Sequence, residues 1–216
     1  MKPAKKSEQS GESVTDRLRE DILLGALAPG TRLIELQLTE RYDVGRAAIR
    51  AAILELDKEG LVRREANRGA KVRSLSIDEA IEVYEARAAL EGLLARHAAK
   101  QASEDDRTHL RSLVPSMRAA IASGDVARFA NLGREFHEQV RRISRHAVAS
   151  DLAEILRNQS RHYPERISAV REHAEQSLAE HTAIVAAIAE GDERGAQAAV
   201  QSHIDSIIAT LRSSTS

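Results

Sequence analysis

The sequence contains no cysteine and no tryptophan, and only 2% of its 216 residues are aromatic. Without cysteine the chain can form neither disulfides nor thiolate sites, which agrees with a reducing compartment such as the cytoplasm. A core with so few aromatics must be aliphatic and alanine-rich, which favours helix over sheet. No apolar run reaches the roughly 18 to 20 residues of a membrane span, and the start of the chain lacks an apolar signal segment. We therefore expect a cytoplasmic protein without a membrane segment, in which residues 1–12 form a disordered tail.

Charge is distributed unevenly along a chain whose formal net charge is only −1. Residues 1–75 carry 15 Lys and Arg against 12 Asp and Glu, whereas the remainder carries 17 against 21. A basic first third is typical of a segment that meets a polyanion, although the excess is small.

Capping residues, glycines and apolar spacing divide the chain near Leu75. The first part predicts helices, a tight corner at 43–45 and then two short β-like runs joined by a basic tip, which is the order of a winged helix-turn-helix. From Ser76 onward every signal is helical. The predicted fold class is therefore mostly α, with a winged helix-turn-helix over 13–75 and an all-helical bundle over 76–213.

Two arginines distinguish the helix that is expected over residues 46–60. Arg46 and Arg50 share one side of this helix, away from the apolar stripe of Ile49, Ile53 and Leu56. Their neighbours are alanines, so the helix can approach a surface closely, and the planar arginine fork can bond guanine O6 and N7 in the major groove. The alternative is that both are solvated side chains of an ordinary amphipathic helix.

Residues 18–76 resemble the DNA-binding domain of the GntR family of bacterial transcription regulators. The resemblance rests on "ILLGALAPGTRL", "VGRAAIRAAI", "GLV" and "NRGAKV". It implies that Arg46 and Arg50 enter the major groove, and that Asn67, Arg68 and Gly69 form a wing tip against the minor groove or the phosphates. Small residues replace the family's usual Ser, Thr-Pro and Glu at four positions: Gly45, Ala47, Ala48 and Ala51. The family's usual operator is therefore not implied.

Three histidines form a candidate metal site. His181 and His203 flank Gly191-Asp192 symmetrically, so a helical hairpin that folds back at this point brings them level. His137, on a helix elsewhere in the bundle, can close the third side. Three imidazoles suit Zn²⁺ or another divalent transition metal. The alternative is that three of the eight histidines fall at these spacings by coincidence.

Residues 76–211 resemble the FCD class of GntR effector domains, which are all-helical. The matching stretches are "VYEARAALEGLLA", "FH" and "EHTAIVAAIAEGDERGAQAAVQSHI". The resemblance implies a pocket that receives small carboxylates, often with a metal such as Zn or Ni, and it aligns His137, His181 and His203 with the histidine ligands. The family's fourth ligand, an Asp or Asn, is replaced here by Gly133.

Arg87 and Glu91, one helical turn apart, are the next candidates for effector binding, because a buried arginine is a natural partner for a carboxylate. The alternative is an ion pair between the two within their own helix. Arg134, three residues before His137, is the remaining candidate.

These features predict a ligand-responsive transcription regulator. A single winged helix reads a short site, so we expect a homodimer on a pseudo-palindromic operator of double-stranded DNA. A small organic acid is the expected effector. The competing hypothesis is a three-histidine metal-dependent hydrolase, but it lacks a HExxH-like pattern and leaves the N-terminal part unexplained.

Overall fold

The computed structural model describes residues 13–65, 69–160 and 171–213. The chain divides into two compact units, residues 1–74 and 75–216, and each is described by itself. The expected wing-tip residues Asn67 and Arg68 lie outside the described residues.

The first unit is a small helical domain with a three-stranded sheet. Its elements are α1 (Val14–Leu23), β1 (Arg32–Leu33), α2 (Glu35–Tyr42), α3 (Arg46–Lys58), β2 (Val62–Glu65) and β3 (Gly69–Val72). The sheet is antiparallel in the order β1-β3-β2. The hairpin of β2 and β3 was expected from the sequence, whereas β1 was not, because two residues are too few to produce an alternating pattern.

Local signals set the helices of this unit. Ser13 and Asp16 form a reciprocal capping box that begins α1. The corner between α2 and α3 turns at Asp43, whose φ of 53° is left-handed, and Gly45 then serves as the N-cap of α3 without a side-chain bond. The apolar faces of the helices meet the sheet in one core that includes Leu18, Ile22, Ile49, Leu56 and Val72.

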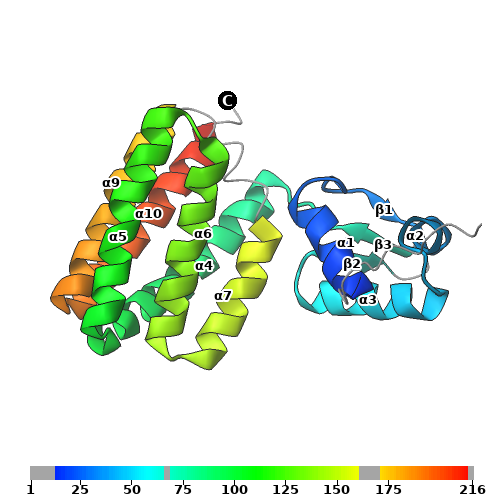
Figure 1. Ribbon diagram of the computed structural model, residues 1–216, viewed down its shortest axis with the longest axis horizontal. Helices are drawn as coiled ribbons and strands as arrows, with labels where there is room; N and C mark the ends of the chain where they lie inside the picture. Colours follow the sequence, from blue (N-terminus) through cyan, green and yellow to red (C-terminus); the bar gives the residue numbers. More distant parts are fainter. Residues whose placement is uncertain (1–12, 66–68, 161–170, 214–216) are drawn as a thin grey trace, which may run out of the picture. The chain divides into compact units, whose positions relative to one another are not determined.

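The second unit is an all-helical bundle. Its helices are α4 (Ile77–Gln101), α5 (Glu104–Ser123), α6 (Val126–Ser144), α7 (Ala147–Ser160), α9 (Arg171–Glu190) and α10 (Glu193–Ser213). Figure 1 shows these helices side by side, and α4 packs against α6, α7, α9 and α10. The predicted fold class, a winged helix-turn-helix followed by a helical bundle, is confirmed. No helix within the described ranges is long and apolar enough to cross a membrane.

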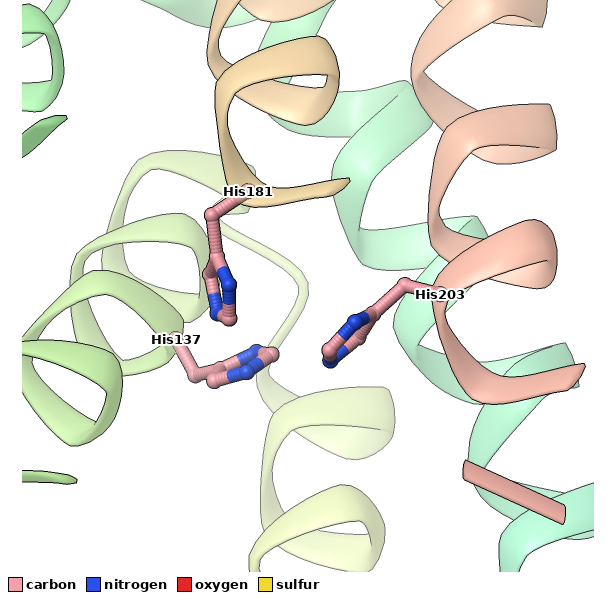
Figure 2. Close-up of side chains that lie close together, drawn as sticks. All are labelled: His137, His181 and His203. Atoms are coloured by element: carbon pink, nitrogen blue, oxygen red, sulfur yellow. The ribbon is translucent and has the colours of Figure 1, made fainter. Parts of the chain in front are cut away.

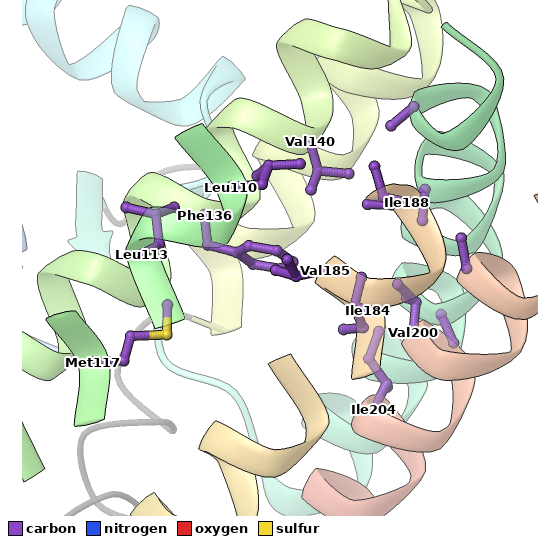
Figure 3. Packing of buried hydrophobic residues seen from close by; sticks show 14 of the residues in the cluster. Leu110, Leu113, Met117, Phe136, Val140, Ile184, Val185, Ile188, Val200 and Ile204 are labelled. Carbon is purple, nitrogen blue, oxygen red and sulfur yellow. The ribbon is translucent and has the colours of Figure 1, made fainter. Parts of the chain in front are cut away.

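The bundle core is aliphatic, as the scarcity of aromatics required. Figure 3 shows side chains from four helices meeting around Phe136, which is 1% exposed. The labelled residues come from α5 (Leu110, Leu113 and Met117), α6 (Phe136 and Val140), α9 (Ile184, Val185 and Ile188) and α10 (Val200 and Ile204). Burying each such side chain contributes roughly 1.5 to 3 kcal/mol. This packing fixes α6, α9 and α10, the helices that carry the three histidines.

The hairpin predicted between His181 and His203 is present. α9 ends at Glu190, Gly191 takes a left-handed φ of 74°, and α10 begins at Glu193. The two helices pack against each other along their lengths. The histidines that flank this turn therefore lie on facing helices.

Candidate functional site

In the first unit, α3 presents two arginines on its exposed side. Arg46 is its first residue and Arg50 lies one turn later; both are exposed, as are Ala47 and Ala51 between and beside them. The opposite side of α3 is buried in the core. Gly69, the first residue of β3, is exposed and has a φ of 84°. The site residues predicted for this unit that are described therefore lie on its surface.

In the second unit, three histidines from three helices converge. His137 comes from α6, His181 from α9 and His203 from α10, and Figure 2 shows their rings turned toward one another. The ring centroids are 5.4 Å apart for His137 and His181, 4.8 Å for His181 and His203, and 5.9 Å for His137 and His203. Each ring offers one nitrogen to a group whose members all lie within 4.8 Å of one another.

Hydrogen bonds to the Nδ1 atoms orient these rings. Nδ1 of His181 lies 2.7 Å from the Ser177 carbonyl oxygen, and Nδ1 of His203 lies 2.7 Å from Oε2 of Glu180. Because carbonyl and carboxylate oxygens accept, both Nδ1 atoms donate their hydrogen, which leaves each Nε2 with a free lone pair.

The same reasoning applies to His137, whose Nδ1 lies 3.3 Å from Oε2 of Glu91. Nε2 of His181 is buried and has no hydrogen-bond partner. Lone pairs on three such nitrogens fit a divalent metal, since metal-bound histidines ordinarily donate their other N–H to a carboxylate or carbonyl.

Burial keeps two of the three imidazoles, His137 and His181, neutral. His181 and His203 are each 4% exposed, and the His137 side chain is 12% exposed. Burial, with a smaller contribution from the neighbouring His203, lowers the pKa of His181 to about 3. Burial also holds the pKa of His137 well below its usual value, and the nearby Arg157 charge acts in the same direction. Neutral imidazole is the form that binds metals.

A cavity of about 350 Å³ opens beside the histidines. All three line it, together with Gly133 and Arg134 of α6. A Cβ atom added to Gly133 meets no other atom within 4 Å, so the position of the family's acidic ligand is open space. The volume lies within the range of small-molecule sites.

A buried network of charged side chains forms part of the cavity wall. Arg87, which lines the cavity, donates from Nε to Oε1 of Glu91 at 2.8 Å and from Nη1 to Oγ of Ser160 at 3.0 Å. Its guanidinium also lies 4.6 Å from the centre of the Tyr84 ring. Arg87 and Glu91 are 4% and 5% exposed. The ion pair that the sequence offered as an alternative for these two residues is therefore formed, while Arg87 also faces the cavity.

Arg157 of α7 is a cavity residue that the sequence did not reveal. Its Nη1 lies 3.3 Å from both Glu91 oxygens, at the long end for a charged hydrogen bond. Burial lowers its pKa to about 10. In the sequence Arg157 suggests a local helix pair with Glu154, but Glu154 instead pairs with Arg141 of α6. Glu180 was also missed, although it directly precedes His181.

Comparison with known proteins identifies both units. The family model described as "Bacterial regulatory proteins, gntR family" matches residues 10–72, and the FCD domain matches residues 82–206. The matched ranges fall one in each compact unit.

Full-length relatives give the same result. The chain is 28% identical over 192 residues to the HTH-type transcriptional regulator YdhC of Bacillus subtilis, covering 88% of this chain and 85% of the relative. It is 28% identical over 202 residues to the HTH-type transcriptional repressor RspR of Escherichia coli, covering 90% and 86%.

Solved structures share the fold. Escherichia coli McbR/YncC has a TM-score of 0.77 at 21% identity, covering 94% of this chain and 97% of that one. A GntR regulator from Rhodococcus has a TM-score of 0.75 at 22% identity, covering 93% and 96%.

The depressed histidine pKa values predict acid sensitivity of the metal-free protein. Histidines in the unfolded chain bind protons below about pH 6.5, whereas His181 and His137 in the folded protein resist protonation. Their contribution to the free energy of unfolding is therefore fully present above that pH and is lost as the pH falls toward the folded pKa. Each histidine contributes up to about 1.4 kcal/mol per pH unit. Urea titrations followed by circular dichroism between pH 7 and pH 5 should show this slope.

His181→Gln should reduce the slope, because it removes a buried imidazole that resists protonation in the folded state. Equal slopes in wild type and His181→Gln would contradict the assignment.

Proposed function

Because the chain belongs to the gntR family of bacterial regulatory proteins and carries an FCD domain, we propose that it regulates transcription as a homodimer whose winged helices bind a pseudo-palindromic DNA operator. A small carboxylate bound in the helical unit modulates that binding. The protein acts in the cytoplasm, where bacterial DNA lies. The observation that carries the proposal is a three-histidine cluster beside a cavity that is also lined by Arg87 and Arg157, in a chain with a DNA-binding unit.

The first unit supplies the contacts to DNA. Arg46 and Arg50 reach base edges in the major groove, and the alanines between them let α3 approach. Asn67, Arg68 and Gly69 of the wing contact the minor groove or the phosphates. Two copies related by twofold symmetry read two half-sites, which gives the length of operator that one unit cannot read.

The second unit binds the effector. Arg157 shares the Glu91 carboxylate with Arg87, which has the shorter bond, so Arg157 is the less compensated cation at the cavity. A ligand carboxylate gives it a second acceptor. Arg87 and Arg134 contact the same ligand from the other cavity walls, and Glu91 holds Arg87 in place. The ligand alters DNA binding to the extent that its affinity differs between the two states of the dimer.

A divalent metal fits the donor set of His137, His181 and His203. When bound, Zn²⁺ or Ni²⁺ supplies a Lewis-acidic centre that attracts carboxylate oxygens. Glu180 and Ser177 hold two of the rings in the tautomer that presents Nε2. Gly133 leaves the position of a fourth, acidic protein ligand vacant, so an effector carboxylate completes the set.

The three-histidine hydrolase is not favoured. Both relatives described above are transcription regulators by name, and the family models cover the DNA-binding unit as well as the bundle. Glu91 and Glu180, two carboxylates beside the histidines, are engaged by histidine Nδ1 atoms. This arrangement fits a ligand-binding site better than a hydrolytic active site, which would need a free carboxylate as general base.

The recognition helix predicts distinct mutant phenotypes in DNA binding. Arg46→Ala and Arg50→Ala should each lose about 1 to 3 kcal/mol of operator affinity and relax discrimination at one position of each half-site, because each removes a base contact. Arg68→Ala should weaken binding evenly across sequences and flatten the salt dependence. The operator is first selected from random duplexes, and affinities are then measured at several salt concentrations.

If both helix variants discriminate operator from random DNA as well as wild type does, α3 is not the recognition helix.

The open position at Gly133 predicts weak metal retention. Purified wild type should hold less than one metal ion per chain and hold more when an effector acid is added. Gly133→Asp, for which the structure has space, should retain metal tightly without effector because it restores an oxygen ligand. Elemental analysis of wild type, His181→Ala and Gly133→Asp makes the comparison. Equal and negligible metal in all three would show that the histidines line a metal-free pocket.

A further inference from the structure

The two arginines of α3 differ in how they are held. Nε of Arg50 lies 3.0 Å from Oε1 and 2.9 Å from Oε2 of Glu35, so one carboxylate holds the inner edge of its guanidinium. Arg46 has no ion-pair partner within the described part of the chain. Glu35 is the first residue of α2, where the positive end of the helix dipole stabilises its charge.

The contact through Nε matters because of the shape of the guanidinium. Nε and the two Nη atoms lie in one plane, and the Nη atoms form its outer end. A carboxylate on Nε restricts rotation of the side chain, while no hydrogen bond within the described residues occupies the Nη atoms. Arg50 thus keeps its outer donors for a partner such as guanine O6 and N7, and loses less rotamer freedom on binding.

Stability does not explain this pair. The Arg50 side chain is 66% exposed and that of Glu35 is 38% exposed. Ion pairs at such exposure contribute little to folding because water screens them and both side chains lose entropy. Glu35 also places a negative charge next to the arginine that is expected to approach DNA, which repels phosphates. Charge alone therefore opposes affinity for DNA.

We propose that Glu35 is a positioning residue that increases sequence discrimination by Arg50 and lowers affinity for random DNA. The inference rests on the proposed function, specifically on base reading by Arg50. It assigns to an acidic residue of the first helix of the helix-turn-helix a role in specificity. The base position read by Arg50 depends on Glu35, whereas the position read by Arg46 does not.

The test uses the full-length protein and a pool of double-stranded DNA with a randomised segment. Selected sequences give the base preference at each position for wild type, Glu35→Ala, Glu35→Gln, Arg46→Ala and Arg50→Ala. Glu35→Ala should reduce preference at the position that Arg50→Ala abolishes, by roughly five- to tenfold, and leave the position that Arg46→Ala abolishes unchanged. Affinity for random DNA at low salt should rise about two- to fivefold in Glu35→Ala.

Glu35→Gln separates orientation from charge. Its amide oxygen still accepts from Nε of Arg50, so it should keep most of the base preference, while affinity for random DNA rises as in Glu35→Ala. In the double variant Glu35→Ala with Arg50→Ala, preference should be no lower than in Arg50→Ala alone, because the two residues act through one contact. Glu55→Ala is the matched control, since Glu55 is an exposed acid of α3 that pairs with Lys58; it should leave every base preference unchanged.

The outcomes separate the two claims. If Arg50→Ala alters no base preference, base reading by Arg50 fails, and the inference fails with it. If Arg50→Ala alters one position and Glu35→Ala leaves that position as in wild type, the inference alone is overturned. A uniform loss across all positions in Glu35→Ala, with a lowered unfolding midpoint, would also overturn it, because that result indicates a structural role.

Discussion

The Glu91 carboxylate, only 5% exposed, binds groups from three helices: Arg87 on its own helix, Arg157 from α7 and His137 from α6. Burial by itself raises the pKa of Glu91, but the charges of Arg87 and Arg157 outweigh this effect and hold the pKa well below its usual value. Glu91 therefore stays ionised. Removing one member of such a network leaves a buried charge uncompensated, which commonly costs about 3 to 5 kcal/mol. The cavity wall and the orientation of His137 both depend on this carboxylate.

Two neutral imidazoles, His137 and His181, line the cavity together with two charged arginines, Arg87 and Arg157. His181 and His137 are neutral because burial depresses the pKa of each imidazole. The arginines remain charged because Glu91 compensates them, although its bonds to Arg157 are long at 3.3 Å. A cavity of this kind attracts an anion whose oxygen atoms accept hydrogen bonds from the arginines. A metal on the histidines would strengthen that preference, because it also binds such oxygens.

The sequence predicted the fold and the histidine cluster because both follow from local or symmetric patterns. Capping boxes at Ser13, Ser76 and Ser103 are local patterns that begin helices, and the turn at Gly191-Asp192 has its second residue midway between His181 and His203. The role of Arg157 could not be read from the sequence. Its partner is 66 residues away, and a nearer acid, Glu154, suggested a local pair. The bond between Glu35 and Arg50 joins two helices across a corner, which no helical spacing reveals.

The central claim is that this cavity binds a small carboxylate through Arg157 and that the binding changes DNA affinity. Calorimetric titration of wild type with mono-, di- and tricarboxylates, and the same acids added to operator-binding assays, test it directly. Arg157→Met should weaken binding of the active acid by about tenfold or more and remove its effect on DNA affinity, while DNA binding without acid persists. Arg111→Met, at an exposed residue of α5 that pairs with Glu104, should behave as wild type. Unchanged acid affinity in Arg157→Met, or acid binding that leaves DNA affinity unaltered, would contradict the account.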